Sequence, residues 1–190
     1  MRQYLEIAGS FTGIVCIYYN MRANIWGWAW GIVSIIIYAY IFYTLKLYAD
    51  FGLQIIFLFV SIYGIYQWLH GNKENIIIVS KNTPIQNIIS ILFTVLIFFL
   101  ICYLLQKYTD ARSPLLDSFN TSLCITAQIL LARKKVENWL FWIIADVLYT
   151  YLYICQTLYI TAAFYSIITI MAVLGYIQWN KMYKTHNIDN

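Results

Sequence analysis

The sequence predicts an all-α integral membrane protein with seven transmembrane helices, arranged as two parallel three-helix repeats joined by a linker helix. Three observations predict this fold class: an apolar composition, seven apolar segments of membrane-spanning length, and an internal repeat at one constant shift. Of the 190 residues, 62% are hydrophobic and 11% are charged, against about 45–50% and about 25% in soluble domains. This composition excludes an ordinary cytosolic enzyme, a secreted disulfide scaffold and a disordered protein.

The first three apolar segments are expected at 4–20, 25–45 and 48–70. Each is close in length to the roughly 20 apolar residues that a helix needs to cross a bilayer. Short polar turns that hold Arg22 and Lys46 separate them. The N-terminal part of the chain is therefore expected to form a bundle of three spanning helices.

The other four segments begin after a polar loop at 71–86. The fourth, at 87–107, contains the most uniformly apolar run of the chain and is followed by a loop that holds Pro114. A basic turn at 133–135 separates the fifth segment from the sixth. The last three segments are expected at 115–132, 138–156 and 158–179.

These segments group into a first bundle at 1–70, loops and a linker helix at 71–114, a second bundle at 115–180, and a cytoplasmic tail at 181–190. Lys and Arg are enriched in cytoplasmic loops. Four of the 12 Lys and Arg residues fall on the side of the N terminus and eight on the other side. The sequence therefore predicts an N terminus outside and a C terminus inside. The same asymmetry explains the net charge of +4 without a nucleic acid as partner.

An internal repeat relates the two bundles. One constant shift along the sequence aligns 28–68 with 139–179, and we name it the repeat shift. This alignment gives ten identical pairs in 41 positions. The alternative is a chance match between two helical stretches rich in Tyr and Ile. Paired Trp, Gly and Gln at one shift favour a true repeat; the pairs include Trp28 with Trp139, Gly64 with Gly175, Gln67 with Gln178 and Trp68 with Trp179. Parallel halves of this kind place a substrate between them, near the membrane midplane.

Asp146 is the one charged residue near the middle of an apolar segment. A charge at that depth costs at least about 2.5 kcal/mol on insertion scales, so it is expected to face the bundle interior or a wet cavity. The structural alternative is a hydrogen bond to a neighbouring Tyr, Thr or Gln. Asp146 is therefore the first candidate for a binding residue.

An aromatic face accompanies this carboxylate. Trp139, Trp142 and Asp146 are spaced i, i+3 and i+7, which places them on one side of a helix. Such a wall suits a flat, cationic, aromatic ligand, because the rings and the carboxylate both attract its charge. Trp139 opens the helix and also fits an interfacial belt, which makes Trp142 the better candidate. The same face continues through Tyr149, Thr150 and Tyr153.

Uncharged polar side chains inside apolar runs are further candidates. Each is able to bind the hydroxyl or amide groups of a substrate, and each is equally suited to a hydrogen bond between helices, worth roughly 0.6 kcal/mol on average. These residues are Gln54, Asn120, Thr121 and Gln128.

Motifs for catalysis and for cofactors are missing from the sequence. It holds neither the phosphate-binding pattern G-x-x-x-x-G-K-[ST] nor the zinc pattern H-E-x-x-H. The cysteines, which are widely spaced in apolar segments, are expected to be reduced packing residues; they are Cys16, Cys102, Cys124 and Cys155. We expect no metal, no cofactor and no enzymatic activity; a membrane-embedded enzyme or a structural helical bundle is the alternative of a different class.

Several segments of both bundles resemble the PnuC family of vitamin transporters, over nearly the whole chain. In the first bundle they are 24–28, 47–50, 53–54 and 63–68. In the second bundle they are 132–134, 137–142 with Asp146, 158–162 and 175–179, of which 137–142 with Asp146 resembles the tryptophan motif of that family.

The resemblance implies a three-plus-one-plus-three fold related to the sugar-transporting SWEET proteins, a homotrimer, and a location in the bacterial inner membrane. It also implies uptake of nicotinamide riboside by facilitated diffusion, with a cytosolic kinase that traps the product by phosphorylation. On the family's pattern, the substrate site holds Trp139, Trp142, Asp146 and Gln54, with Asn120, Thr121 and Gln128 as further members.

Thiamine is the alternative substrate, and riboflavin a further one, because relatives in this family carry them. Leu58 and Gln156 depart from the amide and the lysine of the riboside carriers, and the segment 23–26 resembles the thiamine branch. Nicotinamide riboside and thiamine each carry a cationic aromatic ring. The tryptophans and the aspartate therefore suit both substrates.

Overall fold

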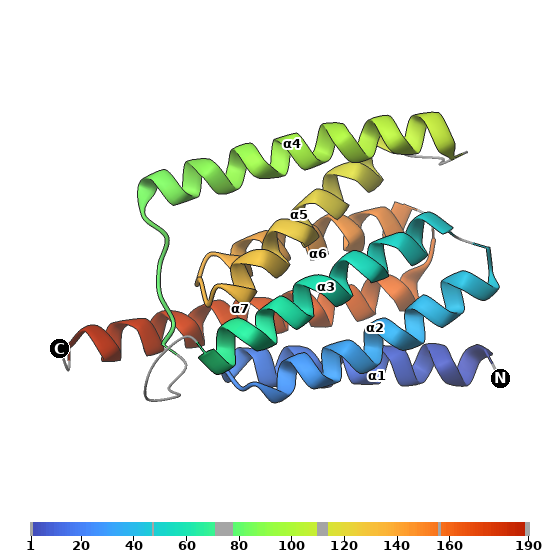
Figure 1. The fold of residues 1–190 in the computed structure, drawn as a ribbon. Helices are drawn as coiled ribbons and strands as arrows, with labels where there is room; N and C mark the ends of the chain where they lie inside the picture. Colours follow the sequence, from blue (N-terminus) through green and yellow to red (C-terminus); the bar gives the residue numbers. More distant parts are fainter. Residues whose placement is uncertain (1, 47, 71–77, 110–113, 156, 189–190) are drawn as a thin grey trace.

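A computed structural model of the protein describes residues 2–46, 48–70, 78–109, 114–155 and 157–188. Within these residues the chain forms seven α-helices, which lie side by side in one elongated bundle (Figure 1). The predicted all-α fold is confirmed. The helices are α1 (Arg2–Met21), α2 (Trp26–Thr44), α3 (Tyr48–His70), α4 (Pro84–Tyr108), α5 (Pro114–Ala132), α6 (Asn138–Cys155) and α7 (Tyr159–Ile188).

Two helix boundaries differ from those expected. α4 begins at Pro84, inside the predicted loop, because Thr83 and Gln86 form a reciprocal capping box and proline is well suited to the first turn. α7 continues past Trp179 to Ile188, so the predicted tail at 181–190 is helical through Ile188. Residues 71–77 of the predicted loop, and Gln156, lie outside the described residues.

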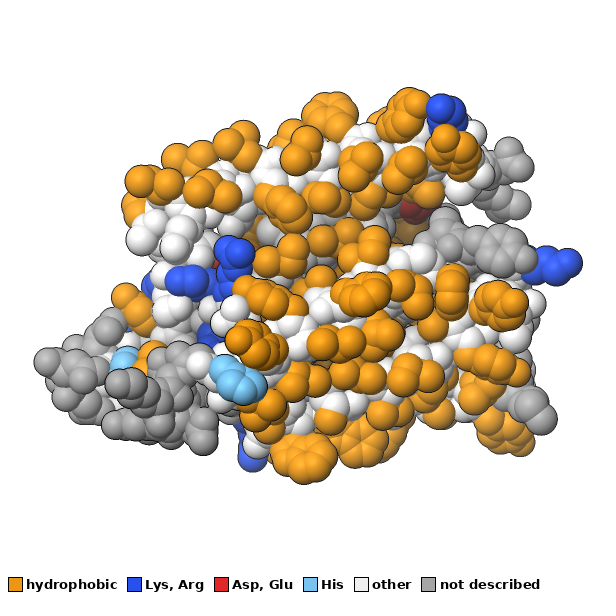
Figure 2. Space-filling view, in the orientation of Figure 1, with side chains coloured by type: hydrophobic (Ala, Val, Ile, Leu, Met, Phe, Trp, Pro, Cys, Tyr) orange, Lys and Arg blue, Asp and Glu red, His pale blue; other side chains and the backbone are white. Residues whose placement is uncertain are grey.

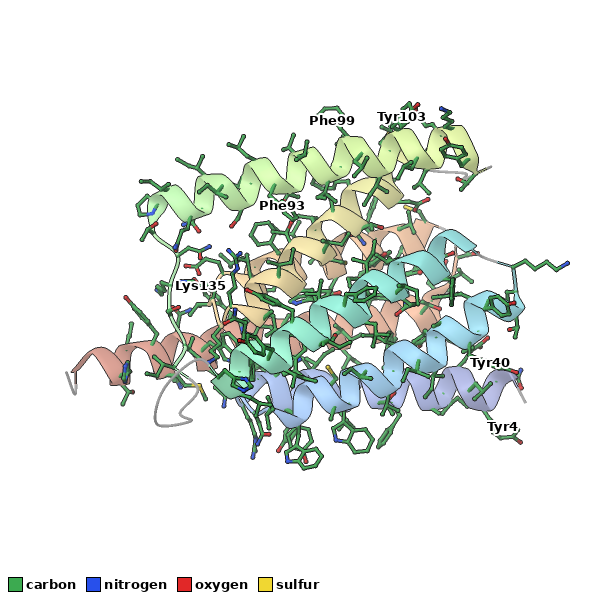
Figure 3. The ribbon with its side chains drawn as sticks, in the orientation of Figure 1. Tyr4, Tyr40, Phe93, Phe99, Tyr103 and Lys135 are labelled. Carbon is green, nitrogen blue, oxygen red and sulfur yellow. The ribbon has the colours of Figure 1, made fainter. Side chains whose placement is uncertain are left out.

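Six of the helices, α2 to α7, are long and apolar enough to cross a membrane. α1 has 20 residues, a length of about 30 Å, and runs alongside them in the bundle (Figure 1). Figure 2 shows a broad hydrophobic surface over the middle of the molecule, with Lys and Arg side chains towards its ends. Tyr4, Tyr40, Phe99 and Tyr103 point away from the bundle, as expected for side chains that face lipid (Figure 3).

Six helices form a closed ring. Around this ring, α1 packs on α2, α2 on α3, α3 on α5, α5 on α6, α6 on α7, and α7 on α1. The two contacts that join the halves, between α3 and α5 and between α7 and α1, are equivalent under the predicted repeat. α1 and α5 run in the same direction (Figure 1), as parallel halves require.

The linker helix α4 lies outside this ring and packs against α5 (Figure 1). The hydroxyls of Thr94 and Thr126 are hydrogen-bonded at 2.8 Å across this contact. The segment before α4 is tied to the turn between α5 and α6, because Ser80 N–H donates to the Lys134 carbonyl and Val136 N–H donates to the Ser80 carbonyl, each at 3.0 Å. Lys135 lies on this turn, at the end of the bundle where the C terminus emerges (Figure 3).

The backbone repeats at the same shift as the sequence. Among the described residues, four non-glycine positions have a positive φ, and they form two pairs at the repeat shift. Ala23 (φ 49°) pairs with Lys134 (φ 58°), and Lys46 (φ 59°) pairs with Thr157 (φ 60°). Each lies just beyond a helix C terminus, where a left-handed residue ends the helix. The turns of the two halves therefore share one backbone conformation, which supports the repeat.

Four tryptophans, two from each half, form a buried layer across one end of the ring, which we name the tryptophan layer: Trp28, Trp68, Trp139 and Trp179. Their side chains are 0–3% exposed. Trp28 meets Trp68 edge-on at 5.5 Å between ring centroids, and Trp139 meets Trp179 edge-on at 5.7 Å. The end of the bundle that holds this layer is named the tryptophan end.

Glycine makes room for the layer at equivalent positions of α3 and α7. A Cβ on Gly175 would lie 2.7 Å from the Trp139 ring, and a Cβ on Gly64 would overlap the Trp28 ring. Hydrogen bonds join the layer across the two halves. Trp68 Nε1 donates to the Leu131 carbonyl at 3.3 Å, and Trp179 Nε1 donates to the Asn20 carbonyl at 2.9 Å. The two donors, and the two acceptors, are again related by the repeat shift.

Candidate functional site

A cavity of about 830 Å³ lies inside the ring and is lined by all six ring helices. Its volume is within the range of small-molecule sites, about 300–1,000 Å³. The lining of the cavity reaches from Asp50 and Ile160, near the ends of α3 and α7, to Trp139 of the tryptophan layer. Asp50 is exposed and Ile160 is 90% exposed, whereas Trp139 is 3% exposed. The cavity therefore opens at the end opposite the tryptophan layer and is closed by that layer.

Asp146 lines this cavity from α6 and is 4% exposed. Its Oδ2 atom has no hydrogen-bond partner. A buried carboxylate oxygen without a partner is costly, and a cation in the cavity would offset that cost. Trp142 lines the cavity one turn before Asp146 on the same helix, so an aromatic ring and a carboxylate face one space, as the sequence predicted.

The spacing of Trp139 predicted a ring on the ligand-binding face with Trp142 and Asp146, but the structure places that ring differently. It touches the inner end of the cavity, but its ring fills the space over Gly175 and packs edge-on against Trp179. It is therefore part of the barrier that closes the cavity. At 3% exposure, it does not belong to an exposed interfacial belt.

Three of the four uncharged polar candidates line the cavity: Gln54 from α3, and Thr121 and Gln128 from α5. Gln128 Nε2 also donates to Ser61 Oγ at 3.4 Å, so it links α5 to α3 and has its oxygen left for a ligand. Thr121 and Gln54 bring a hydroxyl and an amide to the cavity surface.

Asn120 does not line the cavity, although it is 4% exposed and neither polar atom of its side chain has a partner. It precedes Thr121 on α5, and consecutive residues of a helix point about 100° apart. Of these two residues, Thr121 is the one that lines the cavity. A role of Asn120 in the site therefore stays a prediction.

A cluster of tyrosines lies near the open end of the cavity and is the main feature that is absent from the predicted set of site residues. Tyr149 and Tyr153 of α6 stack at 6.0 Å, and Tyr165 of α7 lies 4.9 Å from the first ring and 5.3 Å from the second. All three line the cavity. The helix face that carries Asp146 predicted the first two, whereas Thr150 turns away and donates to the Asp146 carbonyl. The spacing of residues in α7 did not single out Tyr165, but the repeat shift relates it to the candidate Gln54.

Two hydroxyls from the first half also line the cavity and were missed. Ser10 Oγ and Tyr38 Oη are hydrogen-bonded to each other at 2.8 Å, between α1 and α2. A signal for them existed, because Ser10 is equivalent to Thr121 and Tyr38 to Tyr149 at the repeat shift. Applying the repeat to Thr121 and to the predicted helix face that holds Tyr149 would have found both.

The cavity thus combines aromatic rings, one unpartnered carboxylate, amides and hydroxyls. Such a set is able to bind a flat cation that carries hydrogen-bonding substituents. Among the described residues, no group of three His, Cys, Asp or Glu side chains could hold a metal ion.

Comparison with known proteins agrees with this fold. The model of the nicotinamide mononucleotide transporter family matches residues 3–181. The nicotinamide riboside transporter PnuC of Escherichia coli (strain K12) is 27% identical over 202 residues, which cover 93% of this chain and 84% of that protein. The protein of the same name from Neisseria mucosa is 24% identical and covers 97% of this chain and 74% of its own.

A solved structure has the same fold. The crystal structure of the vitamin B3 transporter PnuC matches with a TM-score of 0.77 at 24% identity, over 96% of this chain and 83% of that chain. The family is one of transporters, and the apolar helices make this chain a multi-pass protein of the bacterial inner membrane. Since the family model spans residues 3–181, the chain belongs to the nicotinamide mononucleotide transporter family.

Proposed function

We propose that this protein carries nicotinamide riboside across the inner membrane by facilitated diffusion. The observation that carries the proposal is the Asp146 carboxylate, which is buried, lines the cavity and has one oxygen without a partner. Relatives that match nearly the whole chain are named nicotinamide riboside transporters, which supports this choice of substrate.

The chemistry of nicotinamide riboside fits the lining of the cavity. Its pyridinium ring is flat and positively charged, so it is suited to stack on Trp142 with its charge close to Asp146. Its carboxamide and ribose hydroxyls need hydrogen-bond partners once they leave water. The side chains of Gln54, Thr121 and Gln128, at the cavity surface, supply such partners. These residues with Trp142 and Asp146 form the proposed binding site, and Trp139 closes its inner end.

Thiamine is the main competitor, because its thiazolium ring is also a flat cation. Riboflavin is uncharged and gives no role to the Asp146 carboxylate. The cavity distinguishes the cations from riboflavin more sharply than it distinguishes one cation from the other.

The proposal includes a direction and a movement. Lys and Arg are more frequent in the loops at the tryptophan end, which supports placing that end in the cytoplasm. The cavity then opens to the outside. Release inside requires the two halves to separate at the tryptophan layer, which breaks the bonds from Trp68 to Leu131 and from Trp179 to Asn20. Rocking of the halves about the central cavity achieves this.

Facilitated diffusion only equalises the electrochemical potential of the substrate across the membrane, so accumulation beyond that limit needs a second step. We propose that a cytosolic kinase phosphorylates the product and so prevents its return. Assembly as a homotrimer is part of the same proposal and is tested by measuring the mass of the protein in detergent.

The test is calorimetric titration of the purified protein with nicotinamide riboside, thiamine and riboflavin, followed by uptake into proteoliposomes. We expect saturable binding of nicotinamide riboside, and uptake that stops when the two sides reach equal concentration. Stronger binding of thiamine would replace the substrate but keep the site. Binding of none of the three would overturn the proposed function.

A further inference from the structure

Gly31 of α2 occupies the position in the first half that Trp142 of α6 occupies in the second, because the repeat shift aligns the two residues. Both residues line the cavity. α2 and α6 are opposite members of the six-helix ring, and equivalent residues of the two halves lie at the same depth. Trp142 and Gly31 therefore line the cavity from opposite sides of the ring.

The position that a side chain at Gly31 would take has a single close neighbour. A Cβ at this position would meet one neighbouring atom within 4 Å, Cys16 Sγ, at 3.0 Å. Cys16 also lines the cavity. In the second half the residue equivalent to Cys16 is Ala127. The half that holds Trp142 therefore has alanine at this position, and the half that holds Gly31 has the larger cysteine.

A second observation indicates that this space takes a ligand. Asp146 lies one turn from Trp142 on the same helix and lines the same cavity, 4% exposed and with Oδ2 unpartnered. A glycine facing a tryptophan is by itself only a gap. A gap beside an unpartnered buried carboxylate is suited to a flat cation.

We propose that the cationic ring of the substrate lies between Trp142 and Gly31, and that the missing side chain at Gly31 sets the thickness of this slot. The inference rests on the proposed function, and it adds Gly31 as the second wall of the proposed binding site, opposite Trp142. A flat ring needs about 3.5 Å of contact distance on each face. Any side chain longer than a methyl group at residue 31 takes the space that the ring requires, so this position selects for thin, planar cations.

Graded variants of Gly31 test the slot, with nicotinamide riboside as the probe and calorimetry on the purified protein. Gly31→Ala requires only a small shift of Cys16 and is expected to change affinity by less than about threefold. Gly31→Leu fills the slot and is expected to weaken binding by at least about tenfold, the scale of a lost stacking contact. Gly52→Leu is the matched control, because a Cβ at Gly52 meets nothing within 4 Å.

Exchanging the walls is a stronger test. The variant Trp142→Gly loses the ring, and we expect at least about tenfold weaker binding. Adding Cys16→Ala and Gly31→Trp places a tryptophan on the opposite wall at the same depth, with the small neighbour that the second half uses. This triple variant is expected to regain most of the lost affinity. A triple variant no better than Trp142→Gly overturns the slot.

A third measurement needs no bulky side chain. Saturating nicotinamide riboside should slow the reaction of Cys16 with a small thiol reagent by at least about fivefold, measured by mass spectrometry, and leave exposed Cys155 unchanged. Equal reaction rates at Cys16 with and without ligand, or wild-type affinity in Gly31→Leu, reject the slot while the proposed function stands. If the wild-type protein binds none of the three vitamins, the proposed function itself has failed.

Discussion

The two halves of the ring share a backbone but differ in what they present to the cavity. Glycines and an isoleucine in the first half are replaced by polar or large side chains in the second. The pairs are Gly13 with Cys124, Gly31 with Trp142 and Ile35 with Asp146. The turns, the tryptophan layer and its glycines are the same in both halves.

This contrast separates two requirements. A protein whose halves move against each other needs equivalent packing on both sides of the axis, and the repeated tryptophans and glycines supply it. A ligand such as nicotinamide riboside has no twofold symmetry, so its site needs one wall unlike the other. We therefore assign the symmetric residues to the fold and its barrier, and we propose that the asymmetric ones serve recognition.

The largest expected effect on affinity comes from the pair that differs most between the halves, Ile35 and Asp146. Asp146→Asn removes the buried charge and should weaken binding of nicotinamide riboside by at least about 30-fold, since truncating one partner of a buried charge pair costs about 2–5 kcal/mol. Ile35→Leu, at the equivalent position, should leave the affinity within about threefold. Calorimetry on both variants measures the difference. Equal losses would mean that the halves recognise the ligand symmetrically.

The glycines under the tryptophan layer should respond alike. Gly175→Ala and Gly64→Ala each force a methyl group into a tryptophan ring, which is expected to destabilise the protein by about 1–3 kcal/mol. Thermal unfolding in detergent measures this, with Gly52→Ala as the control in open space. A large loss at one glycine and none at the other would contradict the equivalence of the halves.

The tryptophan hydrogen bonds should act on the balance between closed and open states. Trp68→Phe or Trp179→Phe removes one bond between the halves, worth about 1 kcal/mol. The cavity should then open more often at the tryptophan end. Reaction of Cys16 with a thiol reagent added to that side, in oriented vesicles, is expected to rise about fivefold in either variant. Unchanged rates would show that these bonds do not hold the barrier closed.

The smallest effect concerns α4, which has no counterpart in the repeat. Thr94→Val removes the hydroxyl pair with Thr126, and such bonds between membrane helices average about 0.6 kcal/mol. We expect a small decrease in unfolding temperature and unchanged affinity for nicotinamide riboside. An affinity change of tenfold or more would mean that α4 acts on the cavity, contrary to its place outside the ring.

The sequence predicted several residues that line the cavity, for reasons that can be named. Asp146 and Trp142 were predictable because a charge within an apolar run must face the interior and because helical spacing places the ring beside it. Asn120 and Thr121 were indistinguishable, since adjacent polar residues in a helix give no sign of which one faces inward. Tyr165 did not stand out by its own spacing, because aromatic residues are frequent in this chain, but the repeat shift relates it to the candidate Gln54.

Trp139 shows how the same residue type divides between two tasks. By spacing it belongs with Trp142 on one face of α6, and both touch the cavity. Only the packing of α7 decides that Trp139 fills the space over Gly175, whereas Trp142 is left to line the cavity.

By itself, the sequence determined the class of protein, the helices and the repeat. Those depend on local properties: apolar segments long enough for a bilayer, turn residues between them, and identical residues at one shift. The tertiary structure alone decided that six helices close into a ring, which end of the cavity is shut, and that Gly31 and Trp142 line one cavity. These features depend on contacts between residues far apart in the sequence, where side-chain volume and helix rotation, rather than local pattern, determine which atoms meet.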